Sequence, residues 1–379
     1  MDKTKKVRYK IQLDDIPELS EKEKKQLREV TDKFAFRSNT YYQSLINWDD
    51  PDDPIRRLII PNVDELNAWG RLDASEEEKY TIVPGLQHKY EFTALLLVND
   101  VCGAYCRFCF RKRIFMDMGD EVVRDVTEGL KYIREHKEIN NVLLTGGDPL
   151  VMSTNKLENI IRQLREIDHV QIIRIGTKMP AFNPYRIIDD PAFLEMLKKY
   201  SWDNKKIYIV VHFNHPTELT DAALKAVNMI QKAGGVTVNQ TPLLRGINDD
   251  PKVLGSLLNE LSYIGVPPYY VFQCRPTLGN KTFSVPIEEG FEIFEQARMH
   301  CSGLAKRARL VMSHSTGKIE VVGKTDDHTY FRYHRAADPQ EKARFISFKS
   351  NPEAHWFDDY EEIISEYSID NPFRCYGPE

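Results

Sequence analysis

The chain has 379 residues, enough to bury a substantial core as one large domain or as one domain with extensions. Charged residues make up 29% and hydrophobic residues 41%, and the net charge of -5 argues against a general nucleic-acid surface. No run approaches the roughly 20 apolar residues that span a bilayer, and the basic N-terminus lacks the apolar stretch of a signal peptide. The composition therefore predicts a cytoplasmic protein without nucleic-acid or membrane partners.

The two ends of the chain differ from its middle. Residues 1–90 predict an N-terminal helical and wrapping extension, with a charged helix over 18–34 that begins near Ser20. Residues 324–379 are polar, aromatic and rich in proline, which predicts a C-terminal extension or oligomer arm and hence a homo-oligomer. The remaining part, 91–323, is predicted to form the main domain.

In that main domain, short apolar runs alternate with amphipathic stretches, which predicts βα units and a parallel sheet. Six units form a partial barrel or a doubly wound open sheet, and the alternation alone permits both. The predicted strands cover 94–99, 141–145, 170–176, 206–213, 236–241 and 269–274. The predicted helices cover 121–136, 155–167, 191–200, 220–233, 251–264 and 287–300.

Three cysteines, Cys102, Cys106 and Cys109, follow the first of these strands with the spacing C-x3-C-x2-C. Thiolates this close in one loop can hold three corners of a [4Fe-4S] cluster and leave the fourth iron open for a ligand. A closed zinc site would need four ligands, and a disulfide would need an oxidising compartment. The loop after a strand is where α/β barrels place their chemistry, so the cluster is the favoured interpretation.

The run Cys-Gly-Ala-Tyr-Cys-Arg-Phe-Cys, with an aromatic residue before the third cysteine, resembles the radical S-adenosylmethionine (SAM) superfamily. The resemblance implies an α/β fold, a partial (β/α)6 TIM-type barrel. It also implies that the open iron chelates SAM, which is cleaved to a 5′-deoxyadenosyl radical after reduction by an electron donor such as flavodoxin or ferredoxin.

Other polar residues end strands on the same rim of the predicted barrel. Gly146, Gly147 and Asp148 follow the second strand, where the glycines would allow a ligand to approach the backbone, although a lone Gly-Gly is usually only a turn. His212 and Asn214 alternate with an apolar residue on the fourth strand, so both are expected to face the barrel interior. One such residue is commonly a satisfied core group; two favour ligand binding. These residues, together with Gln240 on the fifth strand, are the predicted cofactor-binding set.

Several segments together narrow the resemblance: His-Phe-Asn-His-Pro, Leu-Leu-Arg-Gly-Ile-Asn and Pro-Tyr-Tyr-Val-Phe-Gln-Cys, with the cysteine loop, are similar to the lysine 2,3-aminomutase family from about His88 to Lys318. Members are isomerases that use SAM and pyridoxal 5′-phosphate (PLP) to move the α-amino group of an amino acid to its β-carbon. The resemblance implies that Lys318 holds PLP covalently, that Tyr90 helps to hold it, and that Arg111 binds the α-carboxylate of a small amino-acid substrate.

The chain also departs from the family pattern. Thr93 stands where the family has an arginine for the PLP phosphate, and the run before Lys318 has fewer glycines. Arg275 and Val311 stand where lysine-specific members have two aspartates for the distal ammonium group. An arginine fork suits a carboxylate, so the predicted substrate is not lysine and carries a distal carboxylate, as glutamate does. Two alternatives remain: a radical SAM enzyme that has lost PLP and abstracts hydrogen for another reaction, and a non-catalytic metal-binding protein.

Overall fold

In the computed structural model, residues 6–116, 121–123, 125–368 and 371–375 are described, and a 14-stranded sheet organises them. Seven central strands run parallel: β5 (Thr93–Asn99), β6 (Asn141–Gly146), β7 (Ile172–Thr177), β8 (Ile207–Val211), β9 (Val236–Leu243), β10 (Pro268–Gln273) and β11 (Arg309–His314). The six predicted strands are confirmed. The seventh parallel strand, β11, was missed by the sequence analysis.

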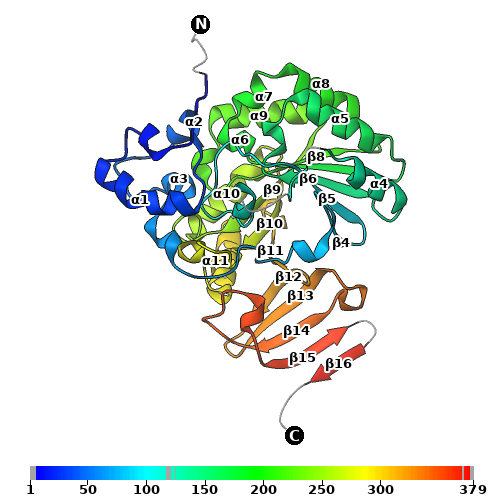
Figure 1. Cartoon of the computed structure of the whole chain (residues 1–379). Helices are drawn as coiled ribbons and strands as arrows, with labels where there is room; N and C mark the ends of the chain where they lie inside the picture. The colour runs from blue at the N-terminus through cyan, green and yellow to red at the C-terminus, as the bar shows by residue number, and fades with distance from the viewer. Residues whose placement is uncertain (1–5, 117–120, 124, 369–370, 376–379) are drawn as a thin grey trace.

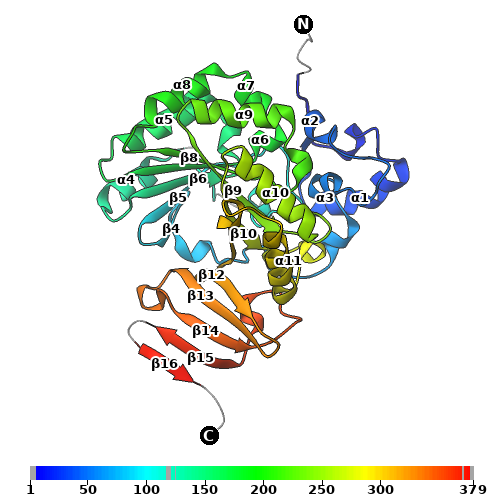
Figure 2. The same ribbon diagram turned by 180° about the vertical axis from the view of Figure 1, so that it is seen from behind.

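The helices that connect these strands lie on the outside of the curved sheet (Figures 1 and 2). They are α4 (Thr127–Glu135), α5 (Thr154–Arg165), α6 (Met179–Phe182), α7 (Tyr185–Ile188), α8 (Pro191–Tyr200), α9 (Asp221–Lys232), α10 (Pro251–Tyr263) and α11 (Ile287–Met299). Neighbours in the sheet follow one another in sequence, whereas a doubly wound sheet reverses its strand order. The fold is therefore an α/β partial barrel of the TIM type, as predicted.

Strand alternation separates the core from the barrel interior. On β6, Val142 and Leu144 are fully buried against the helical layer, while Leu143 and Thr145 face a central cavity. On β7 the residue that faces the cavity is charged, Arg174. Successive side chains point to opposite faces of a strand, so one face builds the core and the other lines the site.

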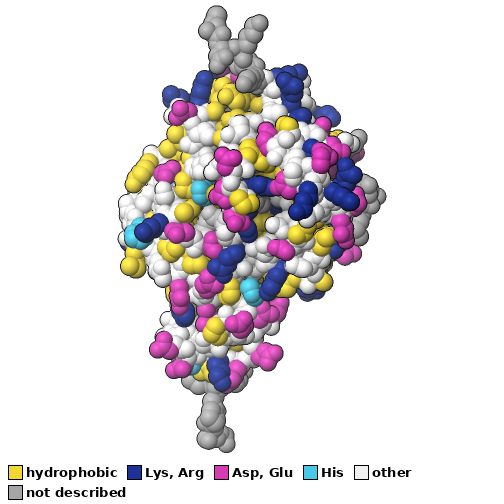
Figure 3. Space-filling view, turned by 90° about the vertical axis from the view of Figure 1, so that its left-hand side faces the viewer, with side chains coloured by type: hydrophobic (Ala, Val, Ile, Leu, Met, Phe, Trp, Pro, Cys, Tyr) yellow, Lys and Arg dark blue, Asp and Glu magenta, His cyan; other side chains and the backbone are white. Residues whose placement is uncertain are grey.

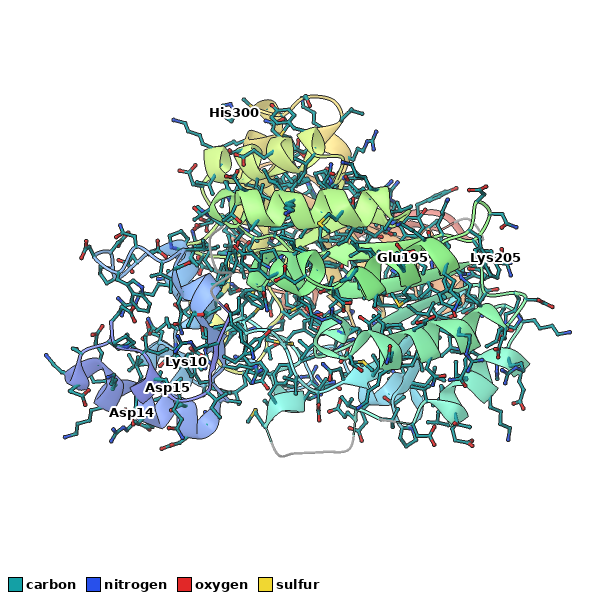
Figure 4. The ribbon with its side chains drawn as sticks, turned by 90° about the horizontal axis from the view of Figure 1, so that it is seen from above. Lys10, Asp14, Asp15, Glu195, Lys205 and His300 are labelled. Atoms are coloured by element: carbon teal, nitrogen blue, oxygen red, sulfur yellow. The ribbon has the colours of Figure 1, made fainter. Side chains whose placement is uncertain are left out.

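The N-terminal part packs beside the barrel (blue in Figure 1). It contains β1 (Tyr9–Lys10), α1 (Glu21–Lys33), β2 (Ser38–Asn39), α2 (Thr40–Gln43) and α3 (Pro54–Ile59), whereas β3 (Thr81–Val83) and β4 (Leu86–Tyr90) join the large sheet beside β5. The predicted helix start is confirmed, because the Ser20 side chain accepts from the Glu23 amide and Glu23 caps Ser20 in return. From above, Lys10, Asp14 and Asp15 lie on this part, away from Glu195 and Lys205 (Figure 4).

The C-terminal part continues the same sheet with antiparallel strands (orange and red in Figure 1). These are β12 (Gly317–Lys324), β13 (His328–Ala336), β14 (Phe345–Lys349), β15 (Ile363–Ser368) and β16 (Asn371–Cys375). The sheet runs without a break past residues 90 and 323, so the division of the chain there stays a prediction. Among the described residues, no helix combines the length and apolar character needed to cross a membrane.

Candidate active site

A cavity of about 340 Å³ lies inside the barrel, a size suited to a small-molecule site. Its wall comes from β4 to β10, from the cysteine loop after β5, and from the C-terminal strands β11 to β13. Every site residue predicted from sequence lines it except Asn214. On one outer face of the molecule, by contrast, acidic and basic side chains are interspersed (Figure 3).

The three predicted metal ligands, Cys102, Cys106 and Cys109, line the cavity as free thiols. Burial raises the pKa of each thiol, to about 12 for Cys106. In the described part of the chain, no three His, Cys, Asp or Glu side chains are grouped tightly enough for a single metal ion. Zinc needs that convergence, whereas a four-iron cluster takes each thiolate at a different corner, and iron would supply the positive charge that buried thiolates need.

Gly146 and Gly147 allow close packing against the start of the cysteine loop. A Cβ on Gly146 would lie 2.5 Å from the Asn99 carbonyl oxygen, and one on Gly147 would lie 2.6 Å from that of Val101. Gly146 also has φ +110°, which favours glycine. These residues let the end of β6 pack against the start of the cysteine loop, and so fix that loop over the cavity.

Asp148 is the third residue of that turn. It accepts hydrogen bonds from the Thr177 hydroxyl at 2.8 Å and the Lys178 amide at 2.7 Å. Burial raises its pKa to about 6, although these hydrogen bonds act in the opposite direction. Asp148 therefore ties the ends of β6 and β7 together at the rim of the cavity.

His212 and Asn214 lie beside each other, with Asn214 Nδ2 3.2 Å from His212 Nε2, but of the two only His212 lines the cavity. His212 lines the cavity, and burial and then the charge of Lys178 lower its pKa well below the usual value. Asn214 is fully buried behind it, because β8 ends at Val211 and the strict alternation ends there. Its oxygen accepts from Lys178 Nζ at 2.6 Å, and its amide donates to Thr241, so Asn214 belongs to the polar core.

Lys318, at the start of β12, brings an amine into the cavity. Its Nζ lies 4.5 Å from the centre of the Phe272 ring and 4.9 Å from that of Tyr270. Burial lowers the pKa of Lys318 well below the usual value, and nearby cations, Arg275 first among them, add to the effect. A lowered pKa favours the free amine, which is the form of a lysine that attacks a carbonyl group.

Gln240 and Tyr90 line the same cavity, from β9 and β4. Lys89, beside Tyr90, donates a hydrogen bond to the His314 carbonyl in the run before Lys318. Burial lowers the pKa of Lys89 to about 7. Strand β4, between β3 and β5 in the sheet, therefore contacts the hairpin that carries Lys318.

Arg111 is held by an acid that the sequence analysis missed. Glu77 accepts from Arg111 Nη2 at 2.6 Å and from Nε at 3.0 and 3.1 Å, and it also accepts from Arg113 at 2.7 Å. Arg111 Nη1 donates to the Thr145 hydroxyl at 3.1 Å. The Nε edge of this guanidinium is therefore fixed, and its outer edge remains for a ligand.

Arg275 also lines the cavity, with its guanidinium carbon 3.5 Å from the centre of the Phe110 ring. Val311 is the other position at which lysine-specific members have an aspartate. It is fully buried on β11 and does not line the cavity. Two more cavity residues, Arg174 and Arg335, were missed. Arg174 interrupts an apolar strand, which was a usable signal; Arg335 lies in a region where no motif marks it.

These residues fit the groups that the sequence implies. Three thiols suit the cluster, a buried lysine of lowered pKa suits the aldehyde of PLP, and several cations suit carboxylate and phosphate groups. A TIM-type partial barrel whose cysteine loop can hold such a cluster at an internal cavity defines a radical SAM enzyme. In agreement, residues 96–254 match the family model described as the radical SAM superfamily.

Similar proteins identify the family within the radical SAM superfamily. A protein of Aquifex aeolicus named "Putative L-lysine 2,3-aminomutase" is 62% identical over 96% of this chain and 97% of its own length. The L-lysine 2,3-aminomutase of Clostridium subterminale is 40% identical over 75% of this chain and 68% of its own. The glutamate 2,3-aminomutase of Clostridioides difficile is 40% identical over 76% and 67%. The chain belongs to the lysine 2,3-aminomutase family, whose members are isomerases.

Family membership implies a [4Fe-4S] cluster, SAM, a small-molecule substrate and a source of electrons. The relatives named for lysine and for glutamate are equally similar to this chain, at 40% identity each. Their names therefore do not identify the substrate.

Proposed function

We propose that the chain is a PLP-dependent radical SAM amino-acid 2,3-aminomutase whose substrate side chain ends in a carboxylate, as in glutamate. The observation that carries the proposal is Arg275. One of its terminal nitrogens, Nη1, is buried and has no hydrogen-bond partner in the described part of the chain. Burial lowers the pKa of Arg275 only to about 10, so the guanidinium stays charged at neutral pH. A buried guanidinium nitrogen without a hydrogen-bond partner is costly, and an anionic ligand that accepts from it would relieve that cost.

The acids of the cavity wall do not offer a site for a distal ammonium group. Among the described lining residues the carboxylates are Glu77 and Asp148. Glu77 is paired with Arg111 and Arg113, and Asp148 accepts from Thr177 and the Lys178 amide. A lysine substrate would place its ammonium group among arginines, which disfavours lysine relative to a dicarboxylic amino acid.

The roles of the chain's own residues follow from their positions. The outer edge of Arg111 would bind the α-carboxylate and fix the adjacent carbons, while Arg275 would bind the distal carboxylate. Cys102, Cys106 and Cys109 would hold the cluster, and Lys318 would hold PLP. A cluster and PLP bound there would supply radical generation from SAM and an electron-delocalising ring for the nitrogen shift.

The test is anaerobic reconstitution with iron, sulfide, SAM, PLP and a reductant, followed by a screen of amino acids for β-amino products. We expect product from glutamate or another dicarboxylic amino acid, and a borohydride-reduced PLP adduct that maps to Lys318. Robust turnover of lysine would refute the substrate assignment. An enzyme that takes up no PLP while it holds iron and sulfide would favour a PLP-independent hydrogen abstraction instead.

A further inference from the structure

A second unpaired cation enters the cavity from the C-terminal part of the sheet. Arg335 on β13 lies directly opposite Lys318 on β12 in the antiparallel ladder. Directly opposed residues share one face of the sheet, with Cβ atoms about 5 Å apart, and like charges in this position are destabilising. Both side chains line the cavity. Two basic groups side by side in a buried site indicate that something anionic binds between or beside them.

The contacts of Arg335 place it at the strand where the sequence lacks an expected cation. Its Nη2 donates to the Thr93 hydroxyl at 2.8 Å, across 242 positions of sequence. Its guanidinium carbon lies 4.1 Å from the centre of the Tyr90 ring. Although residue 93 is a threonine and not a cation, the Arg335 guanidinium from β13 places a positive charge next to its side chain.

Arg174 adds a second guanidinium from β7. Its Nε donates to Asn141 at 2.8 Å, and its pKa is lowered to about 10, first by burial and then by the charge of Arg335. In the described ranges neither Arg335 nor Arg174 forms a salt bridge with a carboxylate. Arg111, in contrast, is already paired with Glu77. Among the described residues, the cavity thus has two arginines whose charges interact with each other and that form no salt bridge with an acid.

We propose that Arg335 and Arg174 form the phosphate-binding end of the cavity, next to Lys318, and that Arg335 from the C-terminal hairpin replaces a cation at position 93. This inference rests on the proposed function, because the phosphate is that of PLP. Two guanidinium groups and the Thr93 hydroxyl match a dianion better than a single carboxylate. The C-terminal part of the sheet would then complete the cofactor site rather than serve only as an extension.

The test compares Arg335→Gln with the unaltered enzyme in the binding of PLP and of 5-deoxypyridoxal, which has the aldehyde but no phosphate. Absorbance titration of the anaerobic apoprotein gives both affinities without any turnover. We expect Arg335→Gln to lower PLP affinity by roughly 10- to 100-fold, as for loss of one charge-assisted hydrogen bond, and to leave 5-deoxypyridoxal affinity nearly unchanged. The ratio of the two affinities cancels any change in the reactivity of Lys318.

Arg332→Gln is the matched control. Arg332 lies on the same strand but is 41% exposed and pairs with Glu320, so the affinity ratio should stay at its unaltered value. A relocated charge gives a second variant: Thr93→Arg combined with Arg335→Gln should recover at least part of the lost ratio. Recovery would show that the charge, and not the local packing, is what the phosphate requires.

An unchanged ratio in Arg335→Gln, with normal PLP binding, would overturn the phosphate site and leave the proposed function intact. A normal ratio with a raised KM for substrate would reassign Arg335 to the substrate carboxylate and also overturn the inference. An equal loss for both aldehydes would indicate a structural role and overturn it as well. If the unaltered enzyme binds neither aldehyde, the proposed function fails first and the inference falls with it.

Discussion

Replacing Glu77 by glutamine removes one negative charge from a buried cluster of arginines and barely changes its shape. Glu77 accepts four hydrogen bonds, three from Arg111 and one from Arg113, at 2.6–3.1 Å. The three side chains are only 8–10% exposed. In Glu77→Gln an amide group would face guanidinium donors, and Arg111 would lose its partner. Breaking a buried pair in this way costs about 3–5 kcal/mol.

The assay is urea unfolding of the anaerobic apoprotein, compared at constant m-value. Glu121→Gln is the matched control, because Glu121 contacts the same Arg113 at 2.7 Å but is 37% exposed. An exposed partner of this kind contributes about 0–1 kcal/mol. Glu77→Gln should also raise the KM for substrate, since Arg111 is then no longer oriented. A loss of less than 1 kcal/mol in Glu77→Gln, or equal losses in both variants, would refute the role given to Glu77.

Two further predictions concern other groups of the site. Burial lowers the pKa of Lys89 from 10.5 to about 7 in the folded state. Between pH 7 and 10.5 the folded state therefore binds fewer protons at Lys89 than the unfolded state does. The contribution of Lys89 to the free energy of unfolding thus rises with pH over that range. Relative to Lys89→Met, the unaltered protein should therefore gain roughly 2 kcal/mol between pH 7.5 and 9.5 in urea unfolding. The exposed Lys232→Met should show no such relative gain, and a parallel pH profile for Lys89→Met would contradict the prediction. Cys106→Ser should abolish the retention of iron and sulfide after reconstitution. Cys301→Ser, which alters a buried thiol outside the cavity wall, should retain both. Full iron retention in Cys106→Ser would exclude the cluster site.

The βα alternation was enough to predict the six strands and their helices, because apolar periodicity reports directly on buried faces. The seventh parallel strand, β11, was missed, since its run from Arg309 to His314 is mixed, with three apolar residues between polar ones. Polar residues alternate with buried ones on the antiparallel strands β12 and β13, and prolines stand in the connections after β13 and β14, so composition alone suggested an arm. Which edge of the barrel they extend depends on pairing between strands, which local sequence does not report.

Site residues could be predicted where the chemistry depends on spacing within one segment, as for Cys102, Cys106 and Cys109. They could not be predicted where side chains meet across the fold. Glu77 and Arg335 reach the cavity from segments without a motif, and only the fold brings Arg335 on β13 to Thr93 on β5, two strands that do not pair with each other. Asn214 contacts His212 but does not itself line the cavity, and β8 ends at Val211, before the alternation that predicted the direction of Asn214 could apply.

The most direct test of the substrate assignment is the ratio of kcat/KM for glutamate to that for lysine, measured in the reconstituted enzyme and in Arg275→Gln. A ratio well above one, which falls roughly 10- to 100-fold in the variant through loss of glutamate turnover, is the predicted result, as for one charge-assisted hydrogen bond. A ratio below one in the unaltered enzyme, or a ratio that Arg275→Gln leaves unchanged, would contradict the proposal that Arg275 binds a distal carboxylate.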